Sequence, residues 1–508
     1  MHRDRALGCR RLAAAAATAF SLLGLSLIPA LATPAQAACT TYYISNSGSD
    51  SNSGCSASAP WASVAKVNAT TFSAGNQILF QAGGSWTGEL HPLGSGASGN
   101  NIVLASYGSG ADPIIAGAGA AAAVYLDDQQ YWTIEDLYIT NTTSGAAAIR
   151  SGIQLENDTS GILNGITIRY NYIENVKGYW TDATGQPSTS AGIAFNLSDS
   201  YATNGWNDVL IHLNTLVDTD ASGIYLGSLA GTGHDENTTD VTISNNSLTD
   251  AGGNDIVCVF CNGAVVANNL AEDGGSRYSG AGIWTAISKN GIIEDNEVYD
   301  QHKAGSDGQA FDIDLGTDDT TLQYNYSLDN VWGFFEFCCD ADANSAENGT
   351  VRYNISQDDG ADEAVFRLFG VNTSGTSSIY NNTIYVDSSD NSAITTDNPA
   401  GDNLHLTNNI IYNTGSGGYA STSGETWAYN TFYGNHPSSE PSDAHKLTSN
   451  PDFADAGGGG TSRSTATAYD LDSGSPDLGS GVLIANNGGQ DFFGNSVSST
   501  AAPNRGAY

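Results

Sequence analysis

One short phrase recurs ten times in this chain: apolar residues alternate with polar ones, an Asn follows, and another apolar residue comes directly after it. The ten positions are Asn171, Asn214, Asn246, Asn269, Asn296, Asn325, Asn354, Asn382, Asn409 and Asn430. From Asn246 onward the steps are 23, 27, 29, 29, 28, 27 and 21 residues. Such a period is typical of solenoids, and no helix or sandwich pattern explains it. The repeat therefore predicts a chain that winds in stacked coils.

A second short strand lies between consecutive Asn positions and usually opens with a small residue, as in 192–195, 223–226, 282–284 and 310–314. Each coil thus supplies at least two strands. Coils of this kind stack as an all-β, right-handed parallel β-helix, with each strand paired to its equivalents at about 4.8 Å. A turn Asn tolerates the left-handed conformation, and its amide can hydrogen-bond to the Asn above and below. We therefore interpret the Asn column as structural and not as catalytic.

The N-terminus has the features of a targeting segment. Four Arg occur within residues 3–11, an Ala/Leu-rich run spans 12–31, and Ala35-Gln-Ala37 forms a cleavage box. We expect residues 1–37 to be a signal peptide and the protein to be secreted. No later stretch approaches the roughly 20 apolar residues of a membrane span, so no membrane partner is expected.

The chain is strongly acidic, with a formal net charge of −38. Without residues 1–37, which hold four Arg and one Asp, 12 basic residues stand against 53 acidic ones. Nucleic acid is therefore excluded as a partner, because its phosphates require clustered cations. Solubility through charge is the simplest interpretation of the acidity, and cation binding is the alternative.

Six Cys remain after cleavage, in a compartment where thiols tend to pair. Cys39 and Cys55 are expected to staple the first coil. Cys258 and Cys261, and Cys338 and Cys339, could pair within each couple or across coils, and the sequence leaves both open. No His lies at ligand spacing near the first couple, so the spacing does not favour zinc.

The organisation along the chain is that of one elongated domain, which we expect to be a monomer. Residues 38–130 are predicted to form an N-terminal cap with the first coils, because an open first coil would expose a bare strand edge. Residues 131–441 carry the regular coils. Residues 442–508, where the rhythm fades, are predicted to be a C-terminal closing segment.

Superposing the coils predicts a cluster of functional side chains. In the strand 310–314, Phe311 and Ile313 belong inside, which directs Asp312 and Asp314 outward together. By the same alternation Glu336 projects one coil later, Arg367 one coil after that, and Trp284 one coil earlier, all onto one outer surface. The prediction is a cleft lined by Trp284, Asp312, Asp314, Glu336 and Arg367.

Three neighbouring carboxylates repel one another, which raises at least one pKa and separates an acid from a base, as glycoside hydrolysis requires. Asp312, Asp314 and Glu336 are therefore the predicted catalytic residues. The predicted substrate-binding residues are Trp284, Arg367, Lys303 and His302, because an aromatic ring stacks on a sugar and cationic groups orient it. A same-strand spacing of about 7 Å favours inversion, whereas a cross-coil spacing near 5 Å favours retention.

Each assignment has a plainer alternative. Asp312 and Asp314 could be solvated surface residues, Arg367 could serve only to neutralise Glu336, and Trp284 could cover an inserted loop. His302 and Lys303 fit a solvated loop pair better than a proton-transfer group. Asp307 and Asp340 are interpreted as turn residues rather than as members of the cluster.

The whole chain beyond residue 37 resembles the secreted parallel β-helix proteins of the pectin-lyase-like superfamily. The entry segment 42–54, Pro60-Trp61, the stretch 75–86 and above all the stretch 282–327 carry this resemblance. It implies a carbohydrate-active enzyme, and the fold transfers more readily than the reaction. Asp312 and Asp314 are similar to part of the Asp trio of polygalacturonase-type hydrolases, but the His-Gly and Arg-x-Lys partners of that trio are not found here.

The resemblance also implies two alternatives to hydrolysis. In a calcium-dependent lyase, Asp312, Asp314 and Glu336 would hold the ion while Lys303 or Arg367 acts as the base. A non-catalytic β-helix would bind glycan without turnover. We favour a hydrolase acting on a polysaccharide that is neutral or weakly charged, because 12 cations are few for a polyuronate. No metal is predicted among the site residues and no cofactor is required, calcium being the optional exception.

Overall fold

The computed structural model describes residues 39–145, 148–179, 189–228, 234–338, 346–369, 375–396, 403–420 and 424–508. The expected signal peptide lies outside these residues, as do Cys339 and Asp340. The chain divides into two units, residues 1–38 and 39–508, and the second is the folded unit described below. Within the described residues, every helix is too short or too polar to cross a bilayer.

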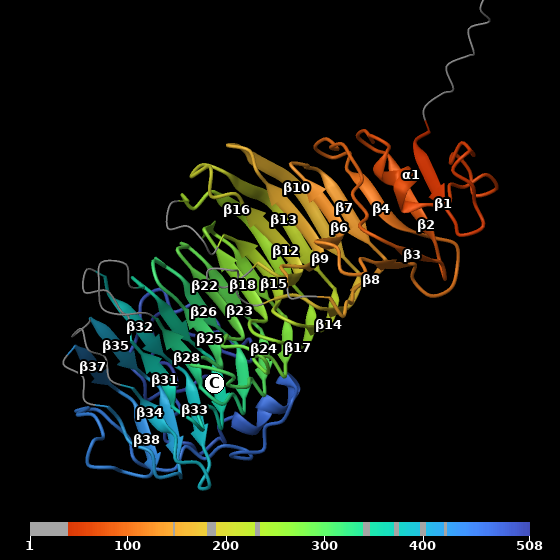
Figure 1. Cartoon of the computed structure of the whole chain (residues 1–508). Coiled ribbons are helices and arrows are strands. Elements are labelled where there is room, and N and C mark those ends of the chain that lie inside the picture. The colour runs from red at the N-terminus through yellow and green to blue at the C-terminus, as the bar shows by residue number, and fades with distance from the viewer. Residues whose placement is uncertain are drawn as a thin grey trace, which may run out of the picture. The chain divides into compact units, whose positions relative to one another are not determined.

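Three parallel sheets form the walls of a β-helix, which confirms the predicted fold class (Figure 1). Each regular coil contributes its first strand to sheet 1, its second to sheet 2 and its third to sheet 3. The sequence predicted at least two strands per coil, and the regular coils have three. Sheet 1 contains β1 (Thr41–Ile44), β2 (Gln77–Gln81), β4 (Ile102–Tyr107), β7 (Trp132–Glu135), β10 (Ile162–Arg169), β13 (Gly205–His212), β16 (Thr238–Ser244), β19 (Cys261–Asn262), β20 (Val265–Ala267), β23 (Ile292–Glu294), β26 (Thr321–Gln323), β29 (Thr350–Arg352), β32 (Ser377–Tyr380), β35 (Leu404–Thr407) and β37 (Glu425–Ala428).

Sheet 2 contains β3 (Ser85–Thr87), β5 (Ile114–Ala116), β8 (Tyr138–Asn141), β11 (Tyr172–Val176), β14 (Thr215–Thr219), β17 (Ser247–Ala251), β21 (Leu270–Glu272), β24 (Glu297–Tyr299), β27 (Tyr326–Leu328), β30 (Ile355–Gln357), β33 (Thr383–Val386), β36 (Ile410–Asn413) and β38 (Thr431–Gly434). Sheet 3 contains β6 (Ala122–Asp127), β9 (Ser151–Asn157), β12 (Ala191–Leu197), β15 (Ser222–Gly227), β18 (Ile256–Val259), β22 (Ile283–Ala286), β25 (Gln309–Ile313), β28 (Gly333–Phe337), β31 (Ala364–Leu368) and β34 (Ala393–Thr395). The two helical elements are α1 (Val64–Asn68) and the 3-10 helix η1 (Arg463–Tyr469).

Alternation along the strands fills the core as the sequence predicts. In sheet 3, Phe311, Phe335 and Phe366 occupy paired positions on β25, β28 and β31 and are at most 1% exposed. Burial of one Phe side chain contributes roughly 1.5–3 kcal/mol. Because the interior positions of these strands are fixed by such residues, the intervening positions must face outward.

The Asn column forms a continuous hydrogen-bonded ladder at the corner between sheets 1 and 2. Each Asn donates both its backbone N–H and its side-chain Nδ2–H to the Oδ1 of the Asn one coil later, at 2.9–3.1 Å. The ladder ends on Asp443, whose Oδ2 accepts the same two bonds from Asn430. The predicted stacking is thereby confirmed, and the structural interpretation of the column is supported by its burial.

The left-handed conformation, however, does not belong to the ladder Asn. It belongs to the residue before it, for example Tyr170 (φ 56°), Leu213 (φ 55°), Tyr324 (φ 59°) and Tyr353 (φ 52°). The sequence interpretation was wrong on this point, because the residue that turns the corner lies outside, whereas the Asn that follows it points inward. Strain of this kind is tolerated because the ladder and the flanking strands fix the corner.

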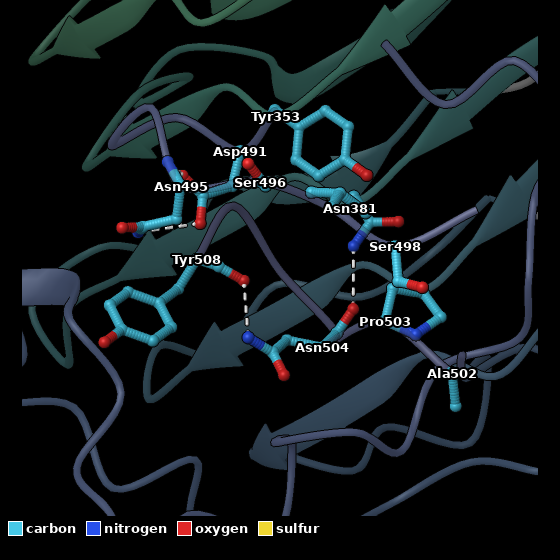
Figure 2. A pocket seen from close by; sticks show the side chains of 11 residues that line it. Tyr353, Asn381, Asp491, Asn495, Ser496, Ser498, Ala502, Pro503, Asn504 and Tyr508 are labelled. Atoms are coloured by element: carbon cyan, nitrogen blue, oxygen red, sulfur yellow. Dashed lines mark hydrogen bonds between the residues drawn. The ribbon is translucent and has the colours of Figure 1, made fainter. Parts of the chain in front are cut away.

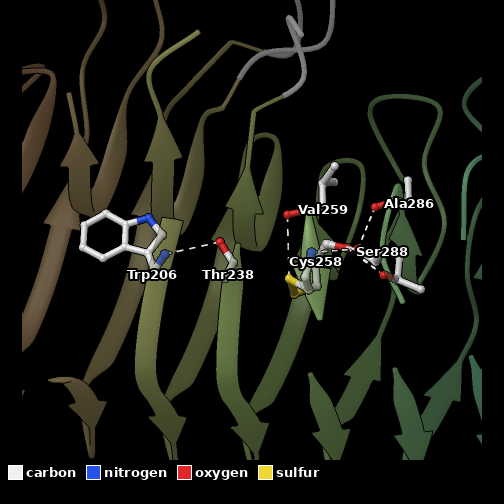
Figure 3. The surroundings of a disulfide bond; sticks show 8 residues. Trp206, Thr238, Cys258, Val259, Ala286 and Ser288 are labelled. Atoms are coloured by element: carbon white, nitrogen blue, oxygen red, sulfur yellow. Dashed lines mark hydrogen bonds between the residues drawn. A yellow bond between two sulfur atoms is a disulfide. The ribbon is translucent and has the colours of Figure 1, made fainter. Parts of the chain in front are cut away.

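Two disulfides are present in the described residues. Cys39 pairs with Cys55 at the start of the first coil, as expected. Cys258 pairs with Cys261, which answers the open question for this couple in favour of pairing within it. The second disulfide spans the corner from β18 to β19, where Phe260 has φ 62° and Ser288 Oγ accepts the Cys261 N–H at 2.9 Å (Figure 3). Cys338 is also disulfide-bonded.

The segment after Ser442 lies along the outside of the coils. Asp443 and Leu447 close the last coil, the latter through a parallel bridge to Thr431. The chain then packs over the outer face of sheet 2, where Phe453 and Tyr469 join the cluster that contains Tyr326. A pocket of about 350 Å³ lies between this segment and the corner at Tyr353 (Figure 2).

Replacing a ladder Asn should be costly, because its side chain serves three coils. Asn325 Oδ1 accepts two bonds from Asn296, and its Nδ2 donates to Asn354 and to two backbone carbonyls. We expect Asn325→Ala to lower the free energy of unfolding by about 3–5 kcal/mol, because at least two buried groups lose their partners. Guanidinium denaturation with fluorescence detection measures this. Asn100→Ala, at an exposed turn, is the control and should change stability by less than about 0.5 kcal/mol; an equally small effect of Asn325→Ala would contradict the ladder's role.

Candidate active site

The predicted row of side chains crosses the outer face of sheet 3. Strand pairing places Trp284 of β22 beside Asp312 of β25, Asp312 beside Glu336 of β28, and Glu336 beside Arg367 of β31. Asp314 directly follows β25. The structure therefore brings together four of the predicted residues in one line, with Asp314 next to it, in the register that superposed coils predict.

The row is not an open surface, however. Asp312, Glu336 and Arg367 are only 5%, 2% and 6% exposed. The predicted cleft does not open over these three, because their polar ends interact with one another and aromatic rings pack on the guanidinium: Trp332 and Phe369 lie 4.8 and 4.7 Å from it. Trp284, Asp314 and Asp307 are partly exposed.

Glu336 and Arg367 form a buried ion pair between Oε2 and Nη1. Burial raises the pKa of Glu336 above its ordinary value, while the Arg367 charge opposes that rise. This contact agrees with the plainer alternative, in which Arg367 serves to neutralise Glu336. An ion pair removed from water requires further hydrogen bonds to be stable, and Glu336 obtains one of them from a neighbouring amide.

That amide belongs to Gln309, the first residue of β25, which the sequence analysis did not single out. Its Nε2 lies 2.5 Å from Glu336 Oε2 and 3.5 Å from Asp312 Oδ2, and its Oε1 accepts the Gly308 N–H at 3.1 Å. Gln309 is 1% exposed. Alternation places residues three apart on opposite faces of a strand, so no pattern in the sequence pointed from Asp312 to Gln309.

Asp312 and Asp314 approach each other closely. Each places a carboxylate oxygen in a group with Cys338 Sγ whose members all lie within 4.8 Å of one another. This is shorter than the 7 Å inferred from strand geometry, because carboxylates at the ends of side chains can lean together. Burial raises the pKa of Asp314 to about 6, with the charge of Asp307 adding to the rise and the Leu315 N–H opposing it.

Burial also raises the pKa of Asp312 well above its ordinary value, and the charges of Asp314, Glu336 and Asp307 raise it further. Asp307 thus contributes to the acidic cluster. It was interpreted as a turn residue, yet its charge acts on all three predicted catalytic carboxyl groups. Its own Oδ2 accepts a hydrogen bond from Ser279 Oγ at 2.8 Å.

Trp332 is the second residue that sequence reasoning missed. The Lys303 Nζ lies 3.6 Å from its ring centroid, and the Arg367 guanidinium also faces this ring. Lys303 is held further by Asp362, at 3.8 Å. A cation over an indole face is stabilised by the ring quadrupole, so Lys303 is positioned at the border of the cluster. A Trp directly before the strand-opening Gly333 was the only sequence hint.

The remaining predicted residues lie at the edges of the site. Trp284 Nε1 donates to Asn254 Oδ1 at 2.9 Å, which fixes the indole beside Asp312. His302 Nε2 lies 3.5 Å from Asp273 Oδ1, and half of its side chain is exposed. This placement agrees with the solvated-loop alternative for His302.

Three buried polar atoms of the site make no hydrogen bond within the described part of the chain: Asp312 Oδ1, Arg367 Nε and Trp332 Nε1. A buried polar atom without a partner costs about 1–3 kcal/mol. Unpaired groups concentrated in one network are typical of sites that trade stability for function.

Part of the carboxylate set predicted for calcium is engaged in other contacts. Calcium takes six to eight oxygen ligands, which include carboxylates, backbone carbonyls and waters. Here Cys338 is disulfide-bonded, and Glu336 Oε2 is taken up by Gln309 and Arg367. Of the three predicted carboxyl ligands, Asp312 and Asp314 therefore remain.

Comparison with known proteins relates the chain to glycan-cleaving enzymes. The chain is 27% identical over 533 residues to a lacto-N-biosidase of Bifidobacterium longum subsp. longum, an alignment that covers 84% of this chain. It spans about a third, 32%, of that relative's length. No protein-family model matches the chain.

Two crystal structures of a GH136 lacto-N-biosidase from Eubacterium ramulus are similar in fold. The selenomethionine derivative and the native protein each give a TM-score of 0.59, with 23% and 22% identity, and the match covers 76% of this chain and 67% of those chains. The resemblance to β-helix carbohydrate-active enzymes is thereby confirmed at the level of the fold.

Separating the buried ion pair should destabilise the protein in a pH-dependent way. Arg367→Met leaves Glu336 without its cation, which raises the pKa of Glu336 further. A raised folded-state pKa favours folding at low pH and costs stability as pH rises. We therefore expect a loss of about 3–5 kcal/mol at pH 8 and a smaller loss at pH 5. Denaturant titrations at both pH values measure this, and the double variant Glu336→Gln/Arg367→Met should lose less than Arg367→Met alone.

Asp314 should make stability fall with rising pH. Its pKa is raised from 3.8 to about 6, so the folded state holds this proton more tightly than the unfolded state does. The resulting contribution to the free energy of unfolding is fully present below about pH 4 and is lost as pH rises through about 6. Asp314→Asn should remove that component. The difference in melting temperature, variant minus wild type, is expected to increase from pH 4 to pH 7. Asp112→Asn, at an exposed carboxyl, is the control; parallel curves for wild type and Asp314→Asn would refute the assigned pKa.

Proposed function

We propose that the protein is a secreted glycoside hydrolase whose reaction takes place at the acidic cluster on the outer face of sheet 3. The observation that carries the proposal is the approach of Asp312 and Asp314 to within 4.8 Å in a buried setting that raises both pKa values. Hydrolysis of a glycosidic bond needs one carboxyl group that keeps its proton and one that is ionised. A cluster of this kind supplies both states at the same pH.

Asp314 is the proposed general acid. It is partly exposed, which allows contact with a glycosidic oxygen, and a pKa of about 6 leaves it protonated under mildly acidic conditions. Asp307 is the proposed second carboxyl group of the reaction, because it is also partly exposed and its Oδ2 accepts a hydrogen bond from Ser279 Oγ. The buried Asp312 and Glu336, which were predicted as catalytic from the sequence, then act on the charge and protonation of Asp314 rather than on the sugar.

The substrate is proposed to be a neutral oligosaccharide or glycan. The similarity to lacto-N-biosidases makes lacto-N-biose-containing glycans the first candidates. The small number of cations in the chain also favours a neutral substrate over a polyuronate. Trp284, fixed by Asn254 and partly exposed, offers a ring on which a sugar can stack next to Asp312.

The export of the protein is part of the proposal. The N-terminal segment has the composition of a signal peptide, and the two disulfides of the described residues fit an oxidising compartment. Elimination by a lyase is less well supported, because the Arg367–Glu336 ion pair occupies one of the two predicted bases and one of the three predicted calcium ligands.

The activity is tested with the secreted protein and a panel of substrates. The panel contains p-nitrophenyl lacto-N-bioside, other neutral glycosides, neutral polysaccharides and a polyuronate. We expect release of reducing ends from a lacto-N-biose-containing substrate, without the ultraviolet absorbance of an unsaturated uronate. Asp314→Asn and Asp307→Asn should each lower kcat by about 10²–10⁴, the contribution of a general acid–base group.

A matched control is Asp127→Asn, on the same face of sheet 3 at β6, which should retain wild-type activity. Ultraviolet-absorbing products would instead identify a lyase. Binding of glycans with no turnover on any substrate would identify a binding protein and reject the proposal.

A further inference from the structure

We infer that Gln309 is a positioning residue that controls how the acidic cluster shares its protons, an inference that rests on the proposed hydrolase function. Gln309 is buried at the start of β25, between two carboxyl groups that belong to neighbouring coils. Its Nε2 donates to Glu336 Oε2 at 2.5 Å and to Asp312 Oδ2 at 3.5 Å. One amide therefore links the two buried members of the cluster.

The orientation of the amide is fixed by the backbone. Gln309 Oε1 accepts the N–H of Gly308 at 3.1 Å. The reverse orientation would set Nε2 against that N–H and Oε1 against two acidic oxygens, so it would lose all three hydrogen bonds whenever the carboxyl groups are ionised. Gly308 itself has φ 148°, and a Cβ there would lie 2.6 Å from the His302 carbonyl oxygen. A glycine is therefore needed where the chain enters β25.

The two hydrogen bonds are unequal, and this inequality has a chemical consequence. Donation to an ionised carboxylate favours the ionised form. Glu336 receives the short bond on the same oxygen that contacts Arg367, whereas Asp312 receives the long bond and its Oδ1 has no partner among the described residues. Gln309 thus favours the anion at Glu336 and leaves the proton to Asp312.

The proton on Asp312 acts in turn on the proposed acid. Asp312 and Asp314 each place a carboxylate oxygen in one group whose members all lie within 4.8 Å of one another, and the charge of Asp314 raises the pKa of Asp312. If Glu336 loses the Gln309 hydrogen bond and takes up the proton that Asp312 held, Asp312 becomes an anion beside Asp314 and raises the pKa of Asp314. Gln309 therefore keeps the neighbour of Asp314 neutral without touching the substrate.

The test uses two substitutions of Gln309 in the full-length secreted protein. Gln309→Met keeps the size and removes both donors. We expect kcat to fall about 10–100-fold with KM changed less than about threefold, and the alkaline limb of the kcat profile to move to higher pH. Gln309→Glu keeps the shape and, when protonated, one donor. Its activity should approach that of wild type at acidic pH and fall as the new carboxyl ionises.

The matched control is Gln323→Met. Gln323 also donates from Nε2 to a glutamate, Glu294 Oε2 at 2.7 Å, but it lies on sheet 1. This variant should leave kcat and the pH profile unchanged. If Gln309→Met and Gln309→Glu lose activity equally at every pH with an unshifted profile, Gln309 is only structural and the inference is rejected. Wild-type kinetics in Gln309→Met reject it as well.

A readout independent of turnover separates this inference from the proposed function. Carboxyl ¹³C NMR titration, with Glu336→Gln used to assign the resonance, gives the pKa of Glu336 directly. We expect it to be higher in Gln309→Met than in wild type and unchanged in Gln323→Met. If the wild-type protein cleaves no substrate, the proposed function fails while this titration still decides the role of Gln309; an unchanged Glu336 pKa rejects that role.

Discussion

The structure depends on the hydrogen bonding of each coil to the coils before and after it. Backbone pairing alone would allow a parallel strand to slip along its neighbour, since the hydrogen bonds of a parallel ladder are evenly spaced. The Asn ladder removes this freedom, because Asn Oδ1 can accept both donors of the preceding Asn only when the corners coincide. Register in all three sheets is then fixed from one corner, and residues about 25 positions apart become neighbours about 4.8 Å apart.

This stacking also explains the electrostatics of the site. A side chain on the outer face of sheet 3 has an equivalent directly above and below it, so acidic residues on successive coils are brought together whether or not their charges repel. Asp312 and Glu336 are opposed in this way, and their burial removes the water that would screen them. One guanidinium, from Arg367, and one amide, from Gln309, offset part of that repulsion. Burial, together with the remaining repulsion, raises the pKa values of these carboxyl groups, which is the property that the proposed acid catalyst needs.

The C-terminal segment shows a different use of the same framework. Its residues pack on the outer faces of sheets 1 and 2, where Tyr326 and Tyr353 would otherwise be uncovered. The proposed site lies on sheet 3. The loops that precede β25 and β28, rather than this segment, border that face. The C-terminal segment and the proposed active site therefore lie on different faces of one solenoid.

The sequence by itself determined the coil, the ladder and the register of the site. Periodicity of the Asn residues and alternation within 310–314 were sufficient, because in a parallel stack sequence equivalence is spatial equivalence. Pairing of Trp284, Asp312, Glu336 and Arg367 follows from that rule. Only the tertiary structure decided the burial of these residues, the left-handed position before each Asn, and the contacts of Gln309 and Trp332. Those features depend on how side chains from strand ends and loops pack over a face, and such packing has no period that a sequence can display.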